Sequence, residues 1–224
     1  MDRYYIKICK STNDTAKFFL ESGVEIPFVV ISEEQTKGRG QQGRKWISQK
    51  GGLYSSFVLN KIDSKKALTL GALASYRTLL VFLPVKIRFP NDIFADKKKI
   101  GGVLVEQISE ATIIGIGINV NQEEFPEEIK GIATSLFLET GVKRPVPEIA
   151  DSLINEIEDL EGQDYEKIFQ EYYKVVSLHG KCFLHLRGGR EVACEIRDID
   201  EELNLDTTVG CFKFNDIVWI EWIY

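Results

Sequence analysis

The sequence has few of the residues that mark several common kinds of site. Its 224 residues include two histidines and four cysteines, and no two cysteines form a Cys-x-x-Cys pair. Structural zinc sites need Cys and His ligands at close spacing, so the sequence predicts no zinc site. No apolar run reaches transmembrane length, and residues 1–4 carry no apolar signal region. We therefore expect a cytoplasmic protein with reduced thiols and no membrane partner.

An excess of positive charge is absent as well. The formal net charge is -6 and the isoelectric point is about 5.2. Charge-driven binding to nucleic acid needs a basic surface, so we expect no nucleic-acid partner. With 44% hydrophobic and 28% charged residues, the composition is typical of a folded chain. The length fits either one large domain or one domain with a small appendage.

Residues 37–46 stand out against this acidic background. They include three glycines, two arginines, two lysines and a tryptophan. Glycine allows a backbone to approach a ligand closely, and arginine supplies planar donors for phosphate or carboxylate oxygens. The segment is either an anion-binding loop or a solvated basic turn, and taken alone it favours neither.

Hydrophobic patterns predict the helices and strands of an α+β fold. Ser11 and Asp14 form a capping pattern for a first helix, which Gly23 would end. An apolar helix is expected at residues 65–82, and two amphipathic helices are expected around 149–160 and 165–176. Short apolar runs predict strands at residues 4–9, 28–32, 53–59, 85–89, 100–107 and 112–120.

The pattern changes near His179. Short alternating strands, separated by glycine and acidic turns, predict a small SH3-like β-barrel after this point. We expect Cys182, Cys194 and Cys211 to be small buried side chains there. The predicted domains are therefore residues 1–178 and residues 179–224.

Two neighbouring strands of the predicted sheet are marked by glycine, at Gly101-Gly102 and at Gly115 and Gly117. Glycine within a strand often marks the close approach of a ligand or of another backbone, so we expect a ligand to lie across this hairpin. Lys99 opens the first of these strands, where its ammonium could stabilise a developing negative charge. The alternative is that residues 96–99 form only a solvated basic turn.

Taken in order, these motifs resemble the signature of biotin-protein ligases. The segments that carry the resemblance are Gly38-Arg39-Gly40, Gly43-Arg44 with Trp46, Arg88-Phe89-Pro90-Asn91-Asp92, Lys99-Ile100-Gly101-Gly102-Val103-Leu104-Val105-Glu106 and Gly115-Ile116-Gly117-Ile118-Asn119-Val120-Asn121. Ser11-Thr12-Asn13, Gln35 and Ala133-Thr134-Ser135-Leu136 also fall where that family has matching residues. The resemblance covers essentially the whole chain and implies a catalytic fold like that of class II synthetases, with a mixed, mostly antiparallel sheet flanked by helices.

The resemblance implies a two-step reaction with ATP, Mg²⁺ and biotin. Biotin's carboxylate would attack the α-phosphate of ATP, and a lysine of a biotin carboxyl carrier protein domain would then attack the resulting adenylate. The carrier domain would belong to a biotin-dependent carboxylase, and family members are often dimers, so a homodimer is expected. No winged helix precedes the catalytic segment, and we therefore expect no repressor function and no operator binding.

The resemblance also implies roles for individual residues. The biotin-binding set is Ser11, Thr12, Asn13, Gln35, Arg39, Gly40, Gln41, Lys99, Gly101, Gly102 and Gly117. The set that binds ATP or the adenylate is Gly38, Arg39, Arg44, Trp46, Asn91, Asp92, Lys99 and Asn119. Lys99 and Arg39 would be catalytic, and Asp92 would serve the metal. Without the resemblance, the asparagines could equally be turn formers.

Two positions depart from the family pattern. Many members have arginine where this chain has Gln41, and that arginine helps to retain the adenylate; we expect faster release here. Arg88-Phe89 replaces the commoner Lys-Trp and keeps one charge and one ring. A lipoate-protein ligase, a nucleic-acid-binding module and a non-enzymatic biotin binder are the competing interpretations. The glycine-arginine loop, the Lys-x-Gly-Gly strand and the C-terminal β-domain favour biotin over lipoate. The acidic isoelectric point argues against the nucleic-acid-binding module, and a non-enzymatic binder would not require Lys99 and Arg39 together.

Overall fold

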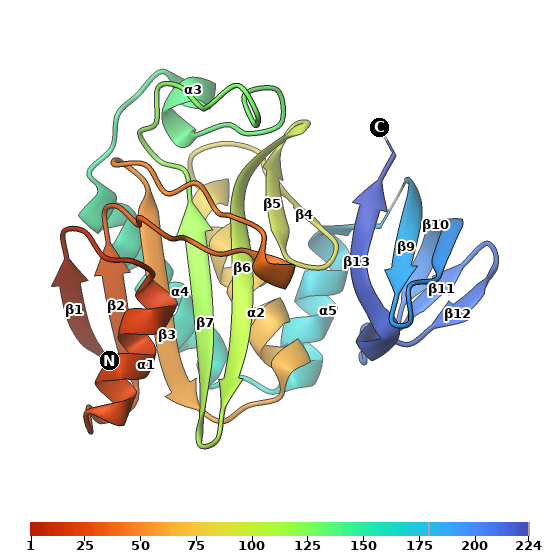
Figure 1. The fold of residues 1–224 in the computed structure, drawn as a ribbon, viewed down its shortest axis with the longest axis horizontal. Coiled ribbons are helices and arrows are strands. Elements are labelled where there is room, and N and C mark those ends of the chain that lie inside the picture. Colours follow the sequence, from red (N-terminus) through yellow and green to blue (C-terminus); the bar gives the residue numbers. More distant parts are fainter. Residues whose placement is uncertain (179, 224) are drawn as a thin grey trace. The chain divides into compact units, whose positions relative to one another are not determined.

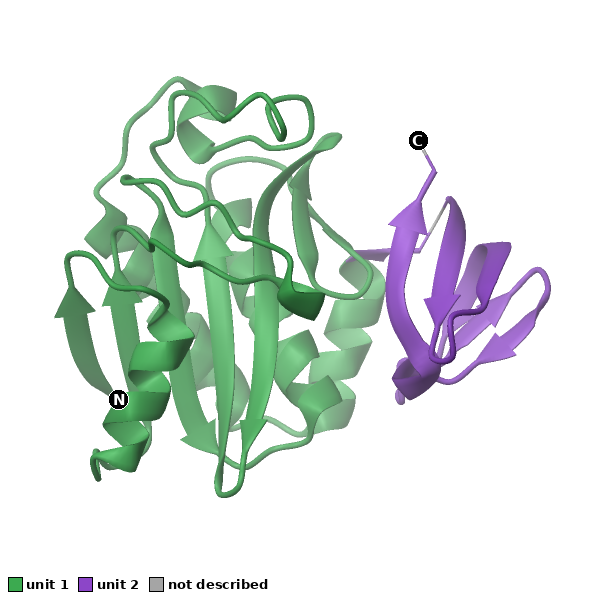
Figure 2. Cartoon of the chain, viewed as in Figure 1, with its two compact units in different colours: residues 1–175 green, residues 176–224 purple. Residues whose placement is uncertain are grey.

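The computed structural model describes residues 1–178 and 180–223, and the chain divides into two compact units, Met1–Val175 and Val176–Tyr224 (Figure 2). His179, where we placed the domain boundary, lies outside the described residues. Among the helices of the described residues, none has the length and apolar character needed to cross a membrane.

The first unit is built on one sheet (Figure 1). Its strands are β1 (Asp2–Ile6), β2 (Phe28–Ser32), β3 (Leu53–Asn60), β4 (Lys86–Arg88), β5 (Asp92–Ala95), β6 (Lys98–Ile108) and β7 (Ala111–Ile118). They lie in the order β1-β2-β3-β7-β6-β5-β4. The β1–β2 pair is parallel and the other pairs in that order are antiparallel, which confirms the predicted mixed, mostly antiparallel sheet.

Helices cover both faces of this sheet. They are α1 (Thr12–Glu21), α2 (Ser64–Leu80), α3 (Leu136–Thr140), α4 (Val146–Glu161) and α5 (Tyr165–Val175). An ideal Cβ on Gly71 of α2 would touch Ile114 of β7, whereas Asn13 of α1 lies against Gly115, the next residue of the strand. Successive strand residues point to opposite faces, so α1 and α2 lie on opposite sides of the sheet.

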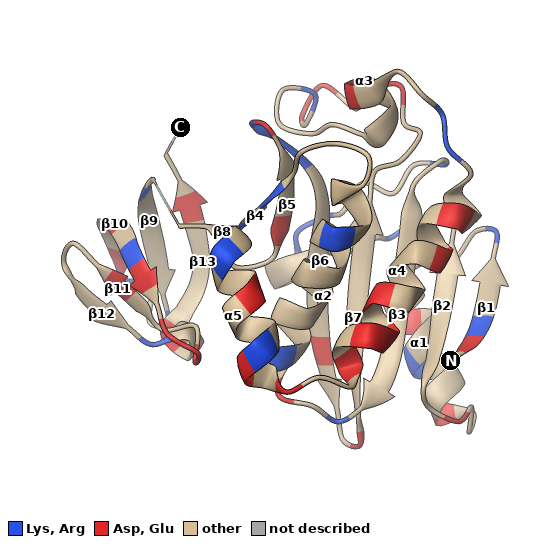
Figure 3. Ribbon diagram, turned by 180° about the vertical axis from the view of Figure 1, so that it is seen from behind, with Lys and Arg blue, Asp and Glu red and all other residues tan. Residues whose placement is uncertain are grey.

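The predicted helix signals hold at α1. Ser11 is its N-cap and accepts a hydrogen bond from the backbone N–H of Asp14, and Gly23 follows the helix with φ of +87°. On the other face, α4 is rich in acidic residues (Figure 3). Arg77 of α2 is ion-paired with Glu156 of α4 and with Glu171 of α5, so the three helices are joined by charge as well as by apolar packing.

The structure differs from the predicted elements in three places. The first strand covers Asp2–Ile6 instead of residues 4–9, because its length is set by parallel pairing with the five residues of β2. The short strand β5 and the short helix α3 were not predicted. The strand β5 has four residues and begins at the aspartate of the Pro-Asn-Asp turn, so it carries too little periodicity to be assigned without its partner β6.

The second unit is mostly one small sheet. It contains β8 (Val176–Ser177), β9 (Lys181–Leu186), β10 (Glu191–Ile199), β11 (Leu205–Thr207), β12 (Gly210–Phe212) and β13 (Ile217–Trp222). The strand order β12-β11-β10-β9-β13 is antiparallel throughout and is consistent with the predicted SH3-like barrel. Cys182 and Cys194 are buried as expected, but Cys211 is exposed on the edge strand β12, so that part of the prediction is wrong.

Candidate functional site

Three glycines share one face of the main sheet, and we call them the glycine patch: Gly102, Gly115 and Gly117. Gly102 of β6 lies directly opposite Gly117 of β7, and Gly115 lies two residues before Gly117 on the same strand. Opposite residues of an antiparallel pair, and residues two apart in a strand, point to the same face. The patch therefore leaves the sheet without side chains at three adjoining positions.

Each glycine admits a side chain from a different segment of the chain. An ideal Cβ on Gly115 would lie 2.4 Å from Asn13 Oδ1, and one on Gly117 would lie 2.6 Å from Trp46 Nε1. An ideal Cβ on Gly102 would lie 3.2 Å from Lys99 Cε. The patch thus gathers predicted site residues from α1, from the 37–46 loop and from the start of β6.

Gly101 does not join this group. Its neighbour Gly102 faces the patch, so Gly101 faces the other side of the sheet, where an ideal Cβ would meet Ile93 at 3.5 Å. The structure therefore separates the two glycines, which the sequence pattern had treated alike.

A β-bulge sets the direction of Lys99. Residues 99 and 102 are three apart, so a regular strand would place their side chains on opposite faces. Lys99 pairs with Phe94 and Gly101 pairs with Ile93, which leaves Ile100 as an extra residue in β6. The extra residue restores Lys99 to the face of Gly102, and bulges commonly redirect side chains next to active sites in this way.

The Lys99 ammonium is held by charge and by its backbone. Nζ lies 2.6 Å from Asp92 Oδ1 of β5 and 5.1 Å from the centre of the Trp46 ring. The Lys99 backbone N–H donates to Ile132 C=O at 2.8 Å, and its C=O accepts from Thr134 N–H at 2.9 Å. Lys99 is therefore fixed at both ends beside the glycine patch.

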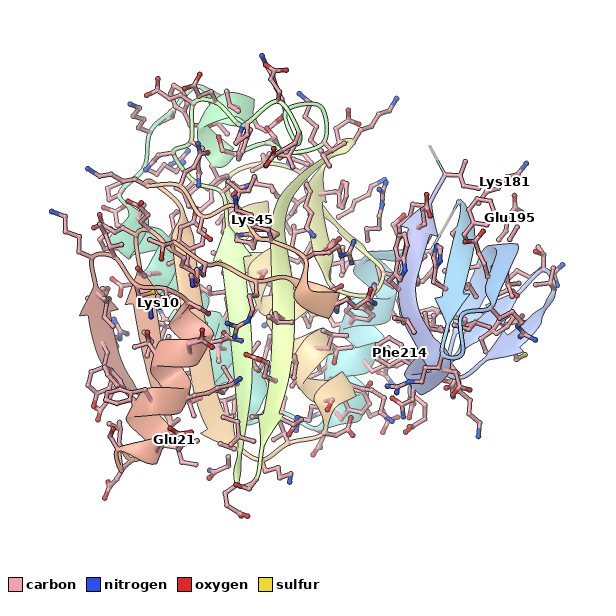
Figure 4. The ribbon with its side chains drawn as sticks, viewed as in Figure 1. Lys10, Glu21, Lys45, Lys181, Glu195 and Phe214 are labelled. Atoms are coloured by element: carbon pink, nitrogen blue, oxygen red, sulfur yellow. The ribbon has the colours of Figure 1, made fainter. Side chains whose placement is uncertain are left out.

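The 37–46 loop folds back on itself in front of β7. Arg39 and Lys45 form an antiparallel bridge, and Lys37 N–H donates to Lys10 C=O at 2.8 Å; Lys10 and Lys45 are marked in Figure 4. The tip of the loop is the 3₁₀ turn η1 (Gln41–Gly43), in which Gln42 has φ of +57°. Gly38 is buried, and an ideal Cβ there would lie 2.5 Å from the Trp46 carbonyl oxygen.

Arg39 and Asp14 form a two-point ion pair. The guanidinium NH1 and NH2 groups donate to the two carboxylate oxygens of Asp14, each at 2.7 Å. This hydrogen bonding lowers the pKa of Asp14 below its usual value. The NH2 group is also 3.7 Å from Glu106 Oε2. The loop arginine is therefore docked on α1.

A chain of polar side chains continues from this ion pair under α1. Thr12 N–H donates to Gln35 Oε1 at 2.8 Å, and Gln35 Nε2 donates to Ser48 Oγ at 2.8 Å. Ser56 Oγ contacts the Thr12 hydroxyl at 2.7 Å and also hydrogen-bonds to Asn13 Oδ1. Ser11 is buried and caps α1, so its hydroxyl serves the helix start. Thr12, Asn13 and Gln35 form the predicted polar cluster.

The predicted nucleotide-side residues fall into two groups. Asn91 and Asn119 are buried, and their side-chain amides donate to Val103 C=O and Thr134 C=O respectively, so each ties a neighbouring segment to the sheet. Arg44 is exposed on the loop, and Gln41 is half-buried beside it. The indole of Trp46 lies against Gly117 and Gly102, and its buried Nε1 has no hydrogen-bond partner among the residues that the structure describes.

Sequence reasoning missed four residues that the site uses: Asp14, Ser48, Ser56 and Glu106. Ser56 left one signal, since two consecutive serines interrupt the otherwise apolar strand β3. Glu106 lay within a motif we had quoted, but it is 93 positions from Asn13, its partner. Only the packing of α1 across β3 and β7, next to β6, brings these two side chains together.

The site offers little to a metal ion by itself. Within residues 1–178 and 180–223, no group of three His, Cys, Asp or Glu side chains is arranged to hold one. Asp92 is the carboxylate beside Lys99, and its Oδ1 faces that ammonium. Magnesium is commonly held by one or two carboxylates together with substrate phosphates, and this donor set fits an ion of that kind.

Comparison with known sequences gives consistent results. The Biotin/lipoate A/B protein ligase family matches residues 5–123. The bifunctional ligase/repressor BirA of Bacillus spizizenii is 37% identical over 153 residues, covering 62% of this chain and 47% of its own length. This chain therefore spans about half the length of that curated relative. The biotin--[acetyl-CoA-carboxylase] ligase of Mycobacterium tuberculosis is 32% identical over 217 residues, covering 89% of this chain and 80% of the relative.

Solved structures show the same similarity over the whole chain. A biotin protein ligase from Aquifex aeolicus, in complex with biotin and ATP, superposes with a TM-score of 0.87 at 27% identity and covers 99% of both chains. A biotin protein ligase from Leishmania major, in complex with biotinyl-5-AMP, has a TM-score of 0.70 at 23% identity and shares the fold.

Proposed function

The chain belongs to the biotin/lipoate A/B protein ligase family, and from that premise we propose that it is an ATP-dependent biotin-protein ligase. It would form biotinoyl-5'-AMP from biotin and ATP and then transfer the biotinoyl group to a lysine of a carrier protein. The observation that carries the proposal is the meeting of two cations, Arg39 and Lys99, with the Thr12-Asn13-Gln35 cluster around the glycine patch.

Biotin suits this cluster because its ureido ring carries both donors and an acceptor. Thr12, Asn13 and Gln35 are short polar groups with both kinds of atom, held in place by Ser48 and Ser56. The glycine patch beside them lets the side chains of Asn13, Trp46 and Lys99 lie close against the sheet, where they would contact the ligand. We propose that the ureido ring lies at the Asn13 end and the carboxylate at the Lys99 end.

The first step brings two anions together. A carboxylate oxygen of biotin attacks the α-phosphorus of ATP, the bond to the bridging oxygen breaks, and pyrophosphate leaves. Cations positioned at the reacting groups reduce the repulsion and stabilise the charge that develops in the transition state. Lys99 would contact the carboxylate and the α-phosphate, and Arg39 would contact the same oxygens from the loop.

Both cations are paired with aspartates in this structure. Lys99 faces Asp92, and Arg39 faces Asp14. We propose that substrate oxygens take the place of these carboxylates when biotin and ATP bind, so that the aspartates hold the cations in position beforehand. Arg39 would leave α1 when the loop closes on the adenylate.

In the second step the ε-amine of an acceptor lysine attacks the carbonyl carbon of the mixed anhydride. A new amide bond forms, the bond to the phosphate oxygen breaks, AMP leaves and the amine releases a proton. We propose that the acceptor is the biotin carboxyl carrier protein domain of a biotin-dependent carboxylase, as the names of two relatives support. We also propose a cytoplasmic homodimer. The acidic net charge supports the further proposal that it has no nucleic-acid partner.

On the nucleotide side, Arg44 and Trp46 would contact ATP from the loop, and Asn91, Asp92 and Asn119 would line its other side. Mg²⁺ would arrive with the ATP phosphates and neutralise part of their charge, with Asp92 as its protein ligand. Gln41 can donate a hydrogen bond but carries no charge, so we propose weaker retention of the adenylate than an arginine would give.

The test is direct. The protein is incubated with biotin, MgATP and a biotin-carrier domain, and mass spectrometry looks for the addition of one biotinoyl group to the carrier. Parallel reactions contain lipoate in place of biotin. Measuring pyrophosphate release in both shows which of the two acids is the substrate. Pyrophosphate release with lipoate and none with biotin would contradict the proposal. The variant Lys99→Ala should lose the reaction.

A further inference from the structure

Glu106 contacts three functional segments at once. It lies on β6 four residues after Gly102, and therefore on the face of the glycine patch. Its Oε2 accepts a hydrogen bond from Asn13 Nδ2, and its Oε1 lies 2.9 Å from Lys17 Nζ. The Arg39 guanidinium is 3.7 Å from Oε2. The carboxylate is half-buried, so water competes only partly for these contacts.

An ionised carboxylate accepts hydrogen bonds but donates none. Asn13 must therefore turn its Nδ2 group toward Glu106, which leaves its Oδ1 facing Ser56. Two oxygens at hydrogen-bond distance need a proton between them, so the Ser56 hydroxyl donates to Asn13. A side-chain amide without such an anchor can exchange its oxygen and nitrogen by a half-turn.

The constraint passes further along the network. A hydroxyl has one proton, and because Ser56 gives its proton to Asn13, the 2.7 Å contact with Thr12 must use the Thr12 proton. The Thr12 hydroxyl also lies 3.1 Å from Gln35 Oε1, but its single proton is already directed to Ser56. Gln35 Oε1 is oriented independently, because the Thr12 backbone N–H donates to it at 2.8 Å, and Gln35 Nε2 donates to Ser48. One carboxylate thus fixes which atoms donate and which accept from Asn13 through Ser56 to Thr12.

We propose that Glu106 is a positioning residue that orients the hydrogen bonds of the biotin-binding cluster before the ligand arrives. The inference rests on the proposed function, because it takes biotin as the ligand of that cluster. Glu106 itself would not touch the reacting atoms. It acts through Asn13, and a network set in one arrangement does not have to reorganise on binding.

The decisive variant is Glu106→Gln. Glutamine has the same shape but offers one acceptor oxygen to two donors, Asn13 Nδ2 and Lys17 Nζ. One of them must then face the glutamine NH₂ group. We expect the KM for biotin and its dissociation constant to rise about tenfold, with kcat and the KM for ATP unchanged.

A second variant tests the direction of the bonds rather than their presence. In Asn13→Asp/Glu106→Gln the glutamine NH₂ donates to the new aspartate, its oxygen accepts from Lys17, and the aspartate still accepts from Ser56. Every donor again meets an acceptor, so the melting temperature should recover relative to Glu106→Gln alone. Biotin affinity is not the measure for this variant, because Asn13 itself contacts the ligand in the proposed site. A Glu106 that stabilised the fold only through its ion pair with Lys17 would not give this recovery, since that ion pair stays broken.

Two control variants show whether the effect comes from the loss of the Lys17–Glu106 ion pair or from any loss of a carboxylate on this part of the chain. Lys17→Gln removes the ion pair with Glu106 but leaves the hydrogen bond to Asn13, and it should change biotin affinity less than twofold. Glu110→Gln makes the same substitution in the exposed turn after β6 and should have no effect. Thermal unfolding of each variant shows whether it remains folded, and the double variant still reports on the hydrogen bond between positions 13 and 106 if Glu106→Gln is unstable.

Calorimetric titration of the full chain with biotin alone, without ATP, distinguishes failure of the proposed function from failure of the role proposed for Glu106. If the unaltered protein binds no biotin, the proposed function fails, and the assignment of Glu106 fails with it. If it binds biotin and Glu106→Gln binds equally well, only the Glu106 proposal is overturned. An equal loss of biotin affinity in Lys17→Gln, or no recovery of the melting temperature in the double variant, would also overturn it.

Discussion

Lys99 Nζ lies 2.6 Å from Asp92 Oδ1, although a regular β-strand would turn Lys99 away from the face that carries Asp92. The extra residue Ile100 in β6 reverses this direction and brings the ammonium over Gly102. The cation of the site is therefore positioned by an irregularity in the strand pairing as well as by its charge partner.

Removal of the Lys99 ammonium should abolish most of the adenylation activity. We expect Lys99→Ala to lower kcat for pyrophosphate release by at least 10²-fold, a loss typical of removing one group that stabilises transition-state charge. Lys98→Ala is the matched control, since Lys98 is the exposed neighbour on the same strand. Comparable losses in both variants would argue for a general charge effect instead of a specific role.

Filling the glycine patch should block the ligand. In Gly115→Ala the new Cβ would lie 2.4 Å from Asn13 Oδ1, so Asn13 must move out of its hydrogen-bonded position. We expect the biotin dissociation constant to rise tenfold or more, and overpacking to destabilise the fold by about 1–3 kcal/mol. Gly131→Ala has open space around the new Cβ and should leave both quantities unchanged. Titration calorimetry and thermal unfolding measure the two effects.

The Asp14–Arg39 pair predicts a dependence of stability on pH. The hydrogen bond from Arg39 lowers the pKa of Asp14 in the folded state. The pair therefore stabilises the fold above the unfolded pKa of about 3.9, and this stabilisation is lost as the pH falls through the folded pKa. Because Asp14 is partly exposed, the contribution should stay below about 1 kcal/mol.

The measurement is the melting temperature of the protein and of Asp14→Asn between pH 3 and pH 8. The difference between the two should be constant from pH 5 to pH 8 and should shrink toward zero in acid. A difference that grows as the pH falls would show that Asp14 is not stabilised as the charged form. Added salt should reduce the difference at neutral pH.

Gln41 should control how long the adenylate stays bound. We expect Gln41→Arg to release biotinoyl-5'-AMP more slowly, because a guanidinium can pair with the adenylate phosphate and an amide cannot. Gln42→Arg adds the same charge at the neighbouring exposed position of η1 and serves as the control. Single-turnover release, followed by chromatography of the free adenylate, gives the rates. Equal rates for Gln41→Arg and the unaltered chain would refute this expectation.

The cysteines should differ sharply in reactivity. Burial raises the pKa of Cys182 to about 12, so its thiolate is scarce at pH 8. Cys211 is exposed on β12 and should react first with a thiol reagent, while Cys182 and Cys194 react only after unfolding. Mass spectrometry of the labelled protein assigns the sites. Rapid labelling of Cys182 in the native protein would contradict the buried packing of the second unit.

Local signals in the sequence were sufficient for most elements of the fold. Ser11 caps the start of α1, and Gly23, with its positive φ, follows the end of the helix. The apolar patterns predicted the long strands and helices. The short strand β5 could not be found this way, because four residues carry too little periodicity and the strand exists only through pairing with β6.

The sequence by itself determined the order of the motifs, the positions of the glycines and the family to which the chain belongs, since these depend on residue identity and spacing. Tertiary structure decided which face each residue serves. It turned Gly101 away from the patch and Lys99 toward it, through a bulge that no periodicity shows. It also brought Glu106 to Asn13 across 93 positions, because α1 packs over strands that follow much later in the chain. Strand register and long-range packing are properties of paired segments, so they cannot be derived from either segment alone.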